Sequence, residues 1–488
     1  MNVNNNFKLL IITEYKLLSI LIVLLFSFSN FFSTSDILLE KDKLDYELPN
    51  IIVFIADDAN WNDFGPYGND FIQTPTINKL AEDGLTVDKA FLMVGQCSPS
   101  RISLLTGIYP HATRAEDLHM PMPEHLQIVP SFLQERGYFT GHMKKTHYGP
   151  HADAQFNWYN ERTADSFPEF LDFAGENPFF LWVGFTEPHR SYPSSQSVEK
   201  RHNPQEVRVP PYLVDDEATR GDLAMYYDEI AHMDIKIGRF MEELRSRNIE
   251  ENTLVIFISD NGMPFPRAKG TVYDEGVRTP LIITWPKRVQ AGSTYDGLVS
   301  LVDLAPTILD VAKIPVGEEM QGESFAKMLF DQSVPGREYL FTQRNWHDAD
   351  EHIRAVRSEY HLLVRNSYVE LPHGTPADIG GSPSFRSLVA KRDSGALTPE
   401  QARLFEVPRP IIEFYNVNED PYQLNNLASH EDYWQLAREY SRVLENWIET
   451  TGDFSSYYRI RDDHTDRWTG VRFQQLIPPM RRINIDNE

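Results

Sequence analysis

The sequence predicts an α/β fold built on a large, mostly parallel sheet. Four uninterrupted apolar runs have the length of strands, and they lie at residues 50–56, 178–185, 252–258 and 281–285. Strands without polar alternation are typical of parallel sheets, which helices cover on both faces. Segments with helical periodicity separate these runs, as such a fold requires. With 488 residues, the chain is long enough for one large domain with a smaller one, or for two ordinary domains.

The N-terminus has the pattern of a signal peptide over residues 1–35. Lys8 and Lys16 precede an apolar run at 17–32, and the small residues 33–35 offer a cleavage site. A transmembrane anchor is the alternative, but the run is short for a span and polar residues interrupt its end. No cysteine follows the run, so a lipid-anchored bacterial lipoprotein is not expected. We therefore expect export, to the periplasm or the medium, without a stable membrane anchor.

The remaining elements follow in chain order after a charged spacer at residues 36–48. The first helix is predicted to have Thr74 as its N-cap and Pro75 at its first position, and to stop at Gly84. A long helix is expected over residues 222–247, because its apolar residues recur with helical spacing.

From about Arg354 onward, the predicted strands become shorter, and a helix is expected at residues 430–449. This change predicts a first domain over residues 49–350, a smaller second domain over 351–455 and a tail at 456–488. Proline-rich stretches with little periodicity predict two long loops, at residues 191–213 and 371–386.

The chain is strongly acidic, with 46 Lys and Arg against 71 Asp and Glu and a net charge of −25. This charge argues against a nucleic-acid binder, whose surface is normally basic. An anionic substrate would need salt screening or a local basic pocket to approach. Cys97 is the only cysteine in the sequence, so in an exported chain it has no disulfide partner.

Two predicted strands end in pairs of oxygen-bearing side chains. Asp57 and Asp58 follow the first strand, and Asp260 and Asn261 follow the strand at 252–258. Ligands of parallel sheets bind at the carboxyl ends of the strands, so the two pairs are expected to meet there. Oxygen ligands alone favour Ca²⁺ or Mg²⁺ over zinc. The alternative is that each aspartate caps a following helix.

A short helix is predicted to begin near Cys97, with Ile102 and Leu105 on one face and Gly107 at its end. A helix N-terminus attracts anions, and Arg101 adds a planar cation suited to an oxyanion. The same setting is expected to lower the pKa of the thiol. The alternative is that Cys97 is a small buried apolar residue, as most lone cysteines are.

Basic residues that could join this cluster are Lys145, His147, His189 and Lys269. Lys145 and His147 are two apart, so an extended backbone would point both in the same direction. His189 lies just past a strand end, and Lys269 follows the second oxygen pair after a short loop. Each of them alone could equally be a solvated surface residue.

These residues resemble a known family. The segment C-S-P-S-R-I-S-L-L-T-G, from Cys97 to Gly107, is similar to the signature C-x-P-S-R-x-S-L-L-T-G of the formylglycine-dependent type I sulfatases, which have an alkaline-phosphatase-like fold. Blocks from about residue 49 to 450 resemble the same family in the same order, among them NIIVFIADDANWNDFGPYG, TPTINKLAEDG, NTLVIFISDNG and EGVRTPLIITWP. The resemblance implies a sulfuric ester hydrolase. It also implies a sheet between helices and a smaller C-terminal α+β domain with a short antiparallel sheet.

The resemblance also implies a role for each residue. A separate maturation enzyme would oxidise Cys97 to formylglycine, which hydrates to a gem-diol. One hydroxyl would attack sulfur to give a covalent enzyme sulfate, and the other would later expel the sulfate. One Ca²⁺ per chain would be held by Asp57, Asp58, Asp260, Asn261 and the modified Cys97. Arg101 and Lys145 would hold the diol and the sulfate, and His147 would orient or deprotonate the diol. His189 and Lys269 would lie at the leaving-group side.

The substrate implied is a sulfated carbohydrate, either an O-sulfated polysaccharide such as ulvan or heparan-type material. P-H-R at 188–190 and D-N-G-M-P-F-P at 260–266 resemble the sulfamidase branch, which acts on N-sulfoglucosamine, whereas Lys269 is the commoner choice in O-sulfatases. A phosphate or phosphonate ester hydrolase and a non-catalytic glycan-binding protein are the alternatives. Candidate sugar contacts are Arg190, His347, Asp350, His352 and Arg354.

Overall fold

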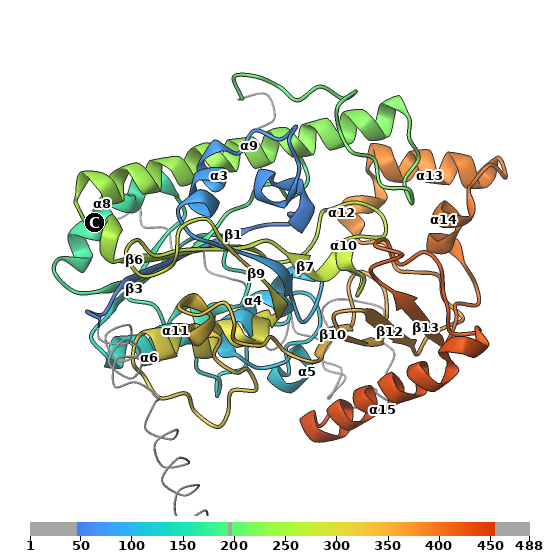
Figure 1. The fold of residues 1–488 in the computed structure, drawn as a ribbon. Helices are drawn as coiled ribbons and strands as arrows, with labels where there is room; N and C mark the ends of the chain where they lie inside the picture. Colours follow the sequence, from blue (N-terminus) through green and yellow to red (C-terminus); the bar gives the residue numbers. More distant parts are fainter. Residues whose placement is uncertain (1–45, 194–197, 454–488) are drawn as a thin grey trace, which may run out of the picture. The chain divides into compact units, whose positions relative to one another are not determined.

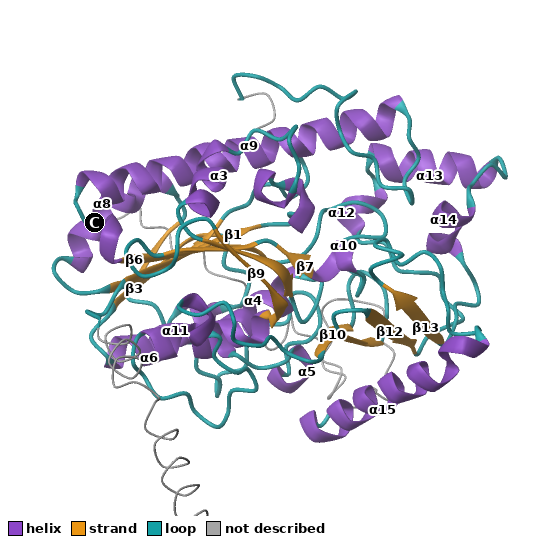
Figure 2. Cartoon of the chain, viewed as in Figure 1, coloured by secondary structure: helices purple, strands orange, loops and turns teal. Residues whose placement is uncertain are grey.

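A nine-stranded sheet with helices on both faces forms the framework of the structure (Figures 1 and 2). The computed structural model describes residues 46–193 and 198–453. The predicted signal peptide, residues 36–45 of the predicted spacer and the predicted tail lie outside the described residues. The strands are β1 (Asn50–Ala56), β2 (Leu85–Phe91), β3 (Phe139–Lys144), β4 (Trp158–Asn160), β5 (Phe179–Gly184), β6 (Thr253–Ser259), β7 (Arg278–Thr279), β8 (Leu281–Thr284) and β9 (Ser293–Ser300).

The strand order is β4-β3-β5-β1-β6-β8-β2-β7, and β9 pairs with β2. β1 lies between β5 and β6 and runs parallel to both, so the ends of these three strands meet at one edge. β8 runs antiparallel to both β6 and β2. The predicted mostly parallel α/β sheet is confirmed. The apolar run that becomes β8 carried no signal for its reversed direction.

Helices cover both faces of this sheet, which explains why its central strands are apolar throughout. On one face lie α3 (Pro75–Glu82), α8 (Phe167–Ala174) and α9 (Glu217–Ser246), and on the other lie α4 (Cys97–Thr106), α5 (Pro110–Thr113), α6 (Val129–Glu135) and α11 (Leu304–Val311) (Figure 1). Every residue from Ile51 to Ala56 is fully buried. The core under α9 includes Ile52, Phe54, Phe257 and Phe240.

The start of α3 differs in detail from its prediction. Pro75 occupies the first turn as expected, but the Thr74 side chain makes no capping hydrogen bond and donates instead to Asn78. The carboxylate of Asp234, from α9, accepts hydrogen bonds from the backbone N–H groups of Thr76 and Ile77 at 3.0 and 2.8 Å. A distant carboxylate therefore satisfies this helix end, which local sequence could not reveal.

A second, antiparallel sheet carries the C-terminal part of the chain. It consists of β10 (Leu340–Arg344), β11 (Ile353–Arg357), β12 (His361–Asn366) and β13 (Ile412–Asn416), in that order. The helix α15 (Trp434–Thr451) packs on β11 and β12. The predicted short antiparallel sheet is confirmed, and its first strand begins at Leu340, ten residues before the predicted domain boundary.

The segment predicted as a loop at 371–386 is partly helical. It contains α12 (Ala377–Gly380) and the start of α13 (Pro383–Asp393), and α14 (Pro399–Ala402) follows. Ser382 caps α13 by accepting a hydrogen bond from the backbone N–H of Phe385, with Pro383 at the first position. This Ser-Pro start signal was present in the sequence. The described part of the other predicted loop, 191–213, contains turns but neither helix nor strand.

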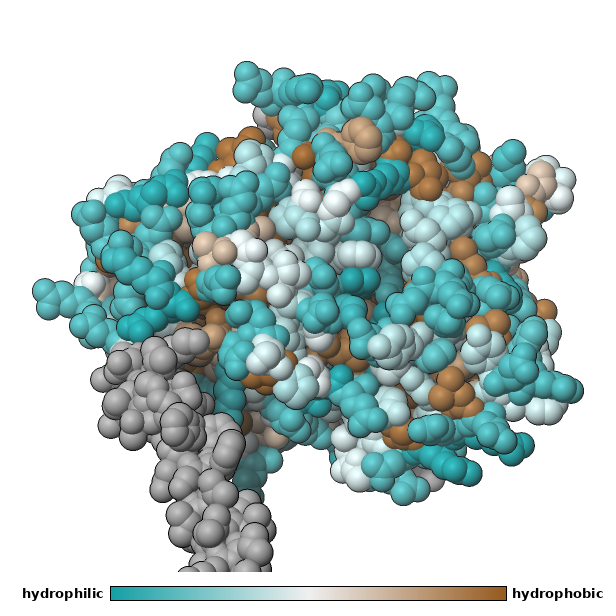
Figure 3. Space-filling view, in the orientation of Figure 1, coloured by the Kyte–Doolittle hydropathy of each residue, from teal (hydrophilic) through white to brown (hydrophobic). Residues whose placement is uncertain are grey.

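On the face of the molecule that Figure 3 shows, hydrophobic side chains are scattered among hydrophilic ones. Large exposed apolar residues such as Phe173, Ile235 and Trp434 belong to different helices. None of the helices in the described ranges is long and apolar enough to cross a membrane.

Candidate active site

The structure brings the two predicted pairs of oxygen-bearing residues together at the carboxyl ends of β1 and β6. The backbone N–H of Asp58 donates to the Asp260 carboxylate at 3.1 Å, and the Asn261 amide donates to the Asp58 carboxylate at 2.7 Å. The pairs meet because β1 and β6 are parallel neighbours in register, with Ala56 beside Ser259. This is the crevice in which ligands of α/β sheets bind.

Cys97 is the first residue of α4, and its side chain reaches the same point. Its Sγ lies 3.3 Å from Asn261 Oδ1 and 3.7 Å from a carboxylate oxygen of each of Asp57 and Asp58. The helix is buried along its whole length and ends at Gly107, which takes the left-handed conformation with a φ of 68°. The predicted helix therefore places the lone thiol against the acidic groups.

The donor set fits a hard divalent cation. Ligand atoms of Asp57, Asp58, Cys97 and Asp260 all lie within 4.8 Å of one another, and all four residues are buried. The alternative that Asp57 or Asp58 caps a helix is not what the structure shows, because Asn60 caps the turn that follows. Three carboxylates with an amide oxygen favour Ca²⁺ or Mg²⁺ over zinc, which prefers nitrogen and sulfur ligands.

Three cations balance the three buried carboxylates. Arg101 is fully buried and donates from Nε to Asp260 at 2.8 Å. Lys145 Nζ lies 2.6 Å from both carboxylate oxygens of Asp57, and Lys269 Nζ lies 2.7 Å from Asp58 Oδ2. Pairing each charge in this way offsets the cost of burying it. The cluster has the mixed charge needed to hold both a cation and an oxyanion.

The Cys97 thiol differs from its prediction. Burial raises its pKa well above the ordinary value, and the nearby Lys145 and Lys269 lower it only in part. The expected lowering by a helix N-terminus and an arginine was therefore wrong, because desolvation of the thiolate is the larger effect. The thiol remains neutral, which argues against a direct role as a nucleophile.

The two histidines occupy different sides of the cluster. His147 is half-buried, and its pKa is lowered well below the ordinary value by burial and by the charge of Lys145. It is therefore neutral, as a proton acceptor must be. His189 hydrogen-bonds from Nδ1 to the Arg190 carbonyl, which directs Nε2 toward Asp58 at 3.8 Å.

The predicted sugar contacts separate into two groups. The guanidinium of Arg190 is held by Asp222 at 2.7 and 2.8 Å and lies over the rings of Tyr192 and Phe265, at 4.8 and 4.6 Å from their centres. Arg354 is buried and paired with Asp453. Because both guanidinium groups are engaged within the protein, the structure does not support sugar contacts for them.

His352 also has a partner within the protein, because its Nδ1 hydrogen-bonds with Ser367 at 2.8 Å. Asp350 is half-buried in the loop after β10. His347 is the member of the predicted set that reaches the cluster. Its ring is buried, contacts Asp348 at 3.0 Å and interacts electrostatically with Lys269.

Sequence reasoning missed two residues of the site. Asp378, in α12, lies 2.8 Å from Lys269 Nζ, and the His119 ring lies 4.9 Å from the His147 ring. A single carboxylate in a Gly- and Pro-rich segment carries no signal by itself. Both residues come from segments that only the tertiary fold brings to the strand ends.

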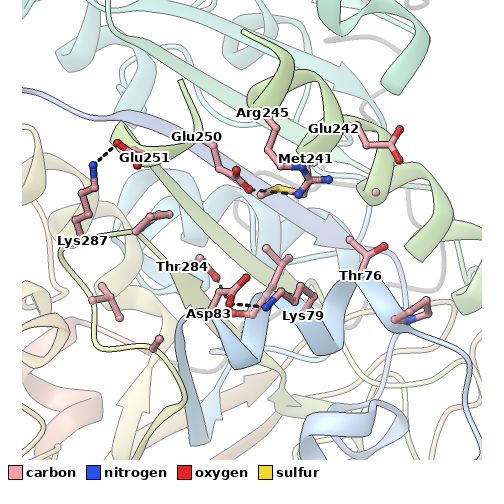
Figure 4. Close-up of a pocket in the computed structure, with 16 residues that line it drawn as sticks. Thr76, Lys79, Asp83, Met241, Glu242, Arg245, Glu250, Glu251, Thr284 and Lys287 are labelled. Atoms are coloured by element: carbon pink, nitrogen blue, oxygen red, sulfur yellow. Dashed lines mark hydrogen bonds and ion pairs between the residues drawn. The ribbon is translucent and has the colours of Figure 1, made fainter. Parts of the chain in front are cut away.

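A separate groove lies at the opposite edge of the sheet. It has a volume of about 630 Å³ and is lined by α3, the end of α9 and the segment after β8. Figure 4 shows that its charged side chains pair with one another, as Lys79 does with Asp83, Arg245 with Glu250 and Lys287 with Glu251. These paired charges are largely exposed, whereas those of the strand-end cluster are buried beside Cys97, so the cluster and not this groove is the candidate active site.

Comparisons with known proteins find relatives that cover most of the chain. A family model described as sulfatase matches residues 49–314, and one described as the C-terminal part of N-sulphoglucosamine sulphohydrolase matches residues 267–371. An ulvan-active sulfatase of Formosa agariphila is 27% identical over 459 residues, covering 83% of this chain and 76% of that protein. Human N-sulphoglucosamine sulphohydrolase is 29% identical over 457 residues, covering 83% of this chain and 90% of that protein.

A solved structure shares the fold. The complex of BT4656 with its substrate D-glucosamine-2-N,6-O-disulfate superposes with a TM-score of 0.65 at 19% identity, covering 83% of this chain and 99% of that chain. At this identity the likeness speaks for the fold alone.

Proposed function

Because the chain belongs to the sulfatase family, we propose that it is an exported enzyme that hydrolyses the sulfate groups of a sulfated carbohydrate. The observation that carries this proposal is the position of Cys97, at the start of α4 and against three buried carboxylates and their cations. No sulfur–sulfur bond explains this thiol, because the sequence has no second cysteine. A neutral buried thiol is also a poor nucleophile.

We propose that Cys97 is the precursor of formylglycine, made by a separate maturation enzyme. The modified side chain would supply the nucleophilic hydroxyl that a thiol cannot. Asp57, Asp58, Asp260 and Asn261 would hold one Ca²⁺, which when bound neutralises charge on the sulfate and on the nucleophile. The four residues already converge within reach of Cys97.

The residues around the nucleophile have distinct tasks in this proposal. Arg101 and Lys145 lie on the same side as Asp57 and present the cations that hold the sulfate oxygens. Neutral His147 accepts the proton of the nucleophilic hydroxyl. His189, at the half-exposed side, protonates the leaving atom, and Lys269 stabilises it.

Two substrate classes remain in the proposal. An O-sulfated polysaccharide such as ulvan is favoured by Lys269 and by the similarity to an ulvan-active sulfatase. N-sulfoglucosamine of heparan-type glycans is favoured by the C-terminal family match, which spans Lys269 and His347. The fold also suits phosphate and phosphonate ester chemistry, which we regard as the next alternative, and non-catalytic glycan binding as the last.

Mass spectrometry of the peptide that contains Cys97 tests the modification. In active protein, the peptide is expected to have lost sulfur and gained oxygen, and an unmodified thiol there would overturn the proposal.

Sulfate release is then measured on O-sulfated and N-sulfated sugars, with a phosphate ester as control. Release of phosphate but not sulfate would support the alternative hydrolase, and glycan binding without turnover would support the non-catalytic protein. Cell fractionation tests export.

A further inference from the structure

Asp378 is an acid at the candidate active site to which the proposed reaction gives no task. Its Oδ2 lies 2.8 Å from Lys269 Nζ and 3.6 Å from His189 Nε2. The same ammonium group also lies 2.7 Å from Asp58 Oδ2. Asp378 therefore contacts both groups that face the leaving atom, and its carboxylate lies within 4.8 Å of the Asp58 carboxylate.

The fold fixes the position of Asp378 at both ends of its segment. The backbone N–H of Ala377 donates to the Asp348 carboxylate at 2.7 Å. Further along, the Ser384 hydroxyl donates to Asp222 at 2.7 Å. Asp222 in turn holds Arg190, the neighbour of His189. A segment attached at both ends holds its carboxylate in one place.

The exposure of the three side chains increases from the bottom of the site to its mouth. Lys269 is 2% exposed, Asp378 19% and His189 30%. Asp378 thus lies between the buried ammonium and the partly exposed imidazole. Burial would raise the pKa of Asp378, but the charge of Lys269 and its hydrogen bond lower it to about 2, so the carboxylate is ionised.

We propose that Asp378 is a positioning residue that holds Lys269 and His189 in the orientation in which they serve the leaving atom. The carboxylate accepts a hydrogen bond from Lys269 and attracts the imidazole, so neither side chain swings toward solvent. This inference rests on the proposed function. It adds a carboxylate from α12 to a site built mainly at the carboxyl ends of β1 and β6.

If Asp378 positions Lys269 and His189, the effect of losing its carboxylate on kcat should depend on the leaving group. An acidic phenol leaves as an anion and needs no proton, whereas a sugar alcohol or amine needs one. Misplacing His189 should therefore slow the poor leaving groups most. A carboxylate that contacted the sugar directly would instead affect sugar substrates and leave a series of aryl sulfates unchanged.

The experiment compares Asp378→Asn with Asp393→Asn, an exposed aspartate of the same segment that pairs only with its neighbour Arg392 among the described residues. Sulfate release is measured on a sugar sulfate and on aryl sulfates of graded leaving-group acidity. We expect Asp378→Asn to lower kcat about 10- to 100-fold for the poorest leaving groups. We expect little change for 4-nitrophenyl sulfate, for Tm and for Asp393→Asn. Asp378→Glu should recover part of the lost kcat.

An equal loss for all leaving groups, a loss confined to sugars, or unchanged activity would each overturn the proposal. A crystal structure of Asp378→Asn tests it independently of turnover. Displaced side chains of Lys269 and His189 are expected, and unmoved ones would contradict the proposal. If the wild-type protein with converted Cys97 released sulfate from none of the substrates, the proposed function would fail. The crystal structure of Asp378→Asn would still show whether Asp378 positions Lys269 and His189.

Discussion

At the scale of single residues, the site depends on a thiol that burial keeps neutral. The Cys97 side chain contacts Asp57, Asp58 and Asn261, and desolvation raises its pKa. A neutral, buried thiol is a poor nucleophile. The proposed chemistry therefore depends on the group that Cys97 would become.

Replacing Cys97 by alanine tests this point. We expect Cys97→Ala to lower sulfate release by at least about a thousandfold, since the nucleophile would be absent. The helix should persist, because alanine is the best helix former, and Tm should stay within about 5 °C. Wild-type protein made without the maturation enzyme is the matched control and should be equally inactive. Activity in either protein would contradict the assignment.

The residues proposed to bind the cation could be predicted from the sequence, but not all the residues around them could. Asp57 and Asp260 follow from one rule, that buried parallel strands end at a common edge. Asp378 could not be found in this way, because its segment has no strand pattern. Arg354 was predicted as a sugar contact because its segment was expected to lie where the second domain meets the pocket. Its partner Asp453 lies 99 residues further along the chain, where local sequence could not reveal it.

At the scale of elements, close packing of the strand ends sets the geometry of the site. Gly184 ends β5, beside the chain that carries Lys145. A Cβ at this position would clash with the Lys145 carbonyl oxygen and would lie 2.7 Å from Nη1 of Arg101. Glycine therefore allows two cations of the site to approach the sheet.

We expect Gly184→Ala to lower activity at least about tenfold and to destabilise the fold by about 1–3 kcal/mol, because Lys145 and Arg101 must shift. Gly221→Ala is the control. That glycine lies in α9 with nothing within 4 Å of the added carbon, so alanine should stabilise the fold by about 0.5–1 kcal/mol and leave activity unchanged. Urea unfolding and sulfate release measure the two effects. Full activity in Gly184→Ala would show that the approach is not needed.

The positions of strands that are buried on both faces could be predicted from the sequence, whereas strand direction and the helices in the Gly- and Pro-rich segment could not. β1 and β6 appear close to the predicted positions, because both faces are covered and all their residues between the two ends are apolar. The direction of β8 depends on pairing between distant strands, which a run of apolar residues does not encode. The segment at 371–386 was predicted to be a loop because prolines and glycines surround the four-residue α12 and precede the start of α13.

At the scale of the whole molecule, the proposed cation site joins the ends of β1 and β6, two neighbouring strands of the large sheet. We expect a chelator to lower Tm, because a cation that binds only the folded protein stabilises it by mass action. Added Ca²⁺ at a hundredfold excess over its Kd should stabilise the fold by about 2.7 kcal/mol. Thermal unfolding with chelator, Ca²⁺ and Mg²⁺ measures this linkage. A Tm that responds to none of them would remove the cation from the proposal.

Asp63, a buried acid outside the candidate active site, couples the stability of the fold to pH. Asp63 lies between the large sheet and α9, where Tyr226 and Tyr227 donate to its carboxyl group at 2.8 and 3.3 Å. Burial, opposed in part by these hydrogen bonds, raises its pKa from 3.8 to about 7. Glu275 is also buried, and its pKa is raised to about 7, chiefly by burial.

The sign of the effect follows from which state binds the proton. Below about pH 4, Asp63 is protonated in both states, and its neutral form is buried without penalty. Between about pH 4 and 7 the folded protein keeps the proton and the unfolded chain releases it, so the free energy of unfolding falls by up to about 1.4 kcal/mol per pH unit.

Asp63→Asn should therefore flatten the dependence of unfolding free energy on pH across this window. Part of the slope should remain, because Glu275 still titrates. Urea unfolding at pH 5, 6, 7 and 8 measures the slope, with the exposed Asp165→Asn as control, and an unchanged slope in Asp63→Asn would show that Asp63 is ionised in the folded protein.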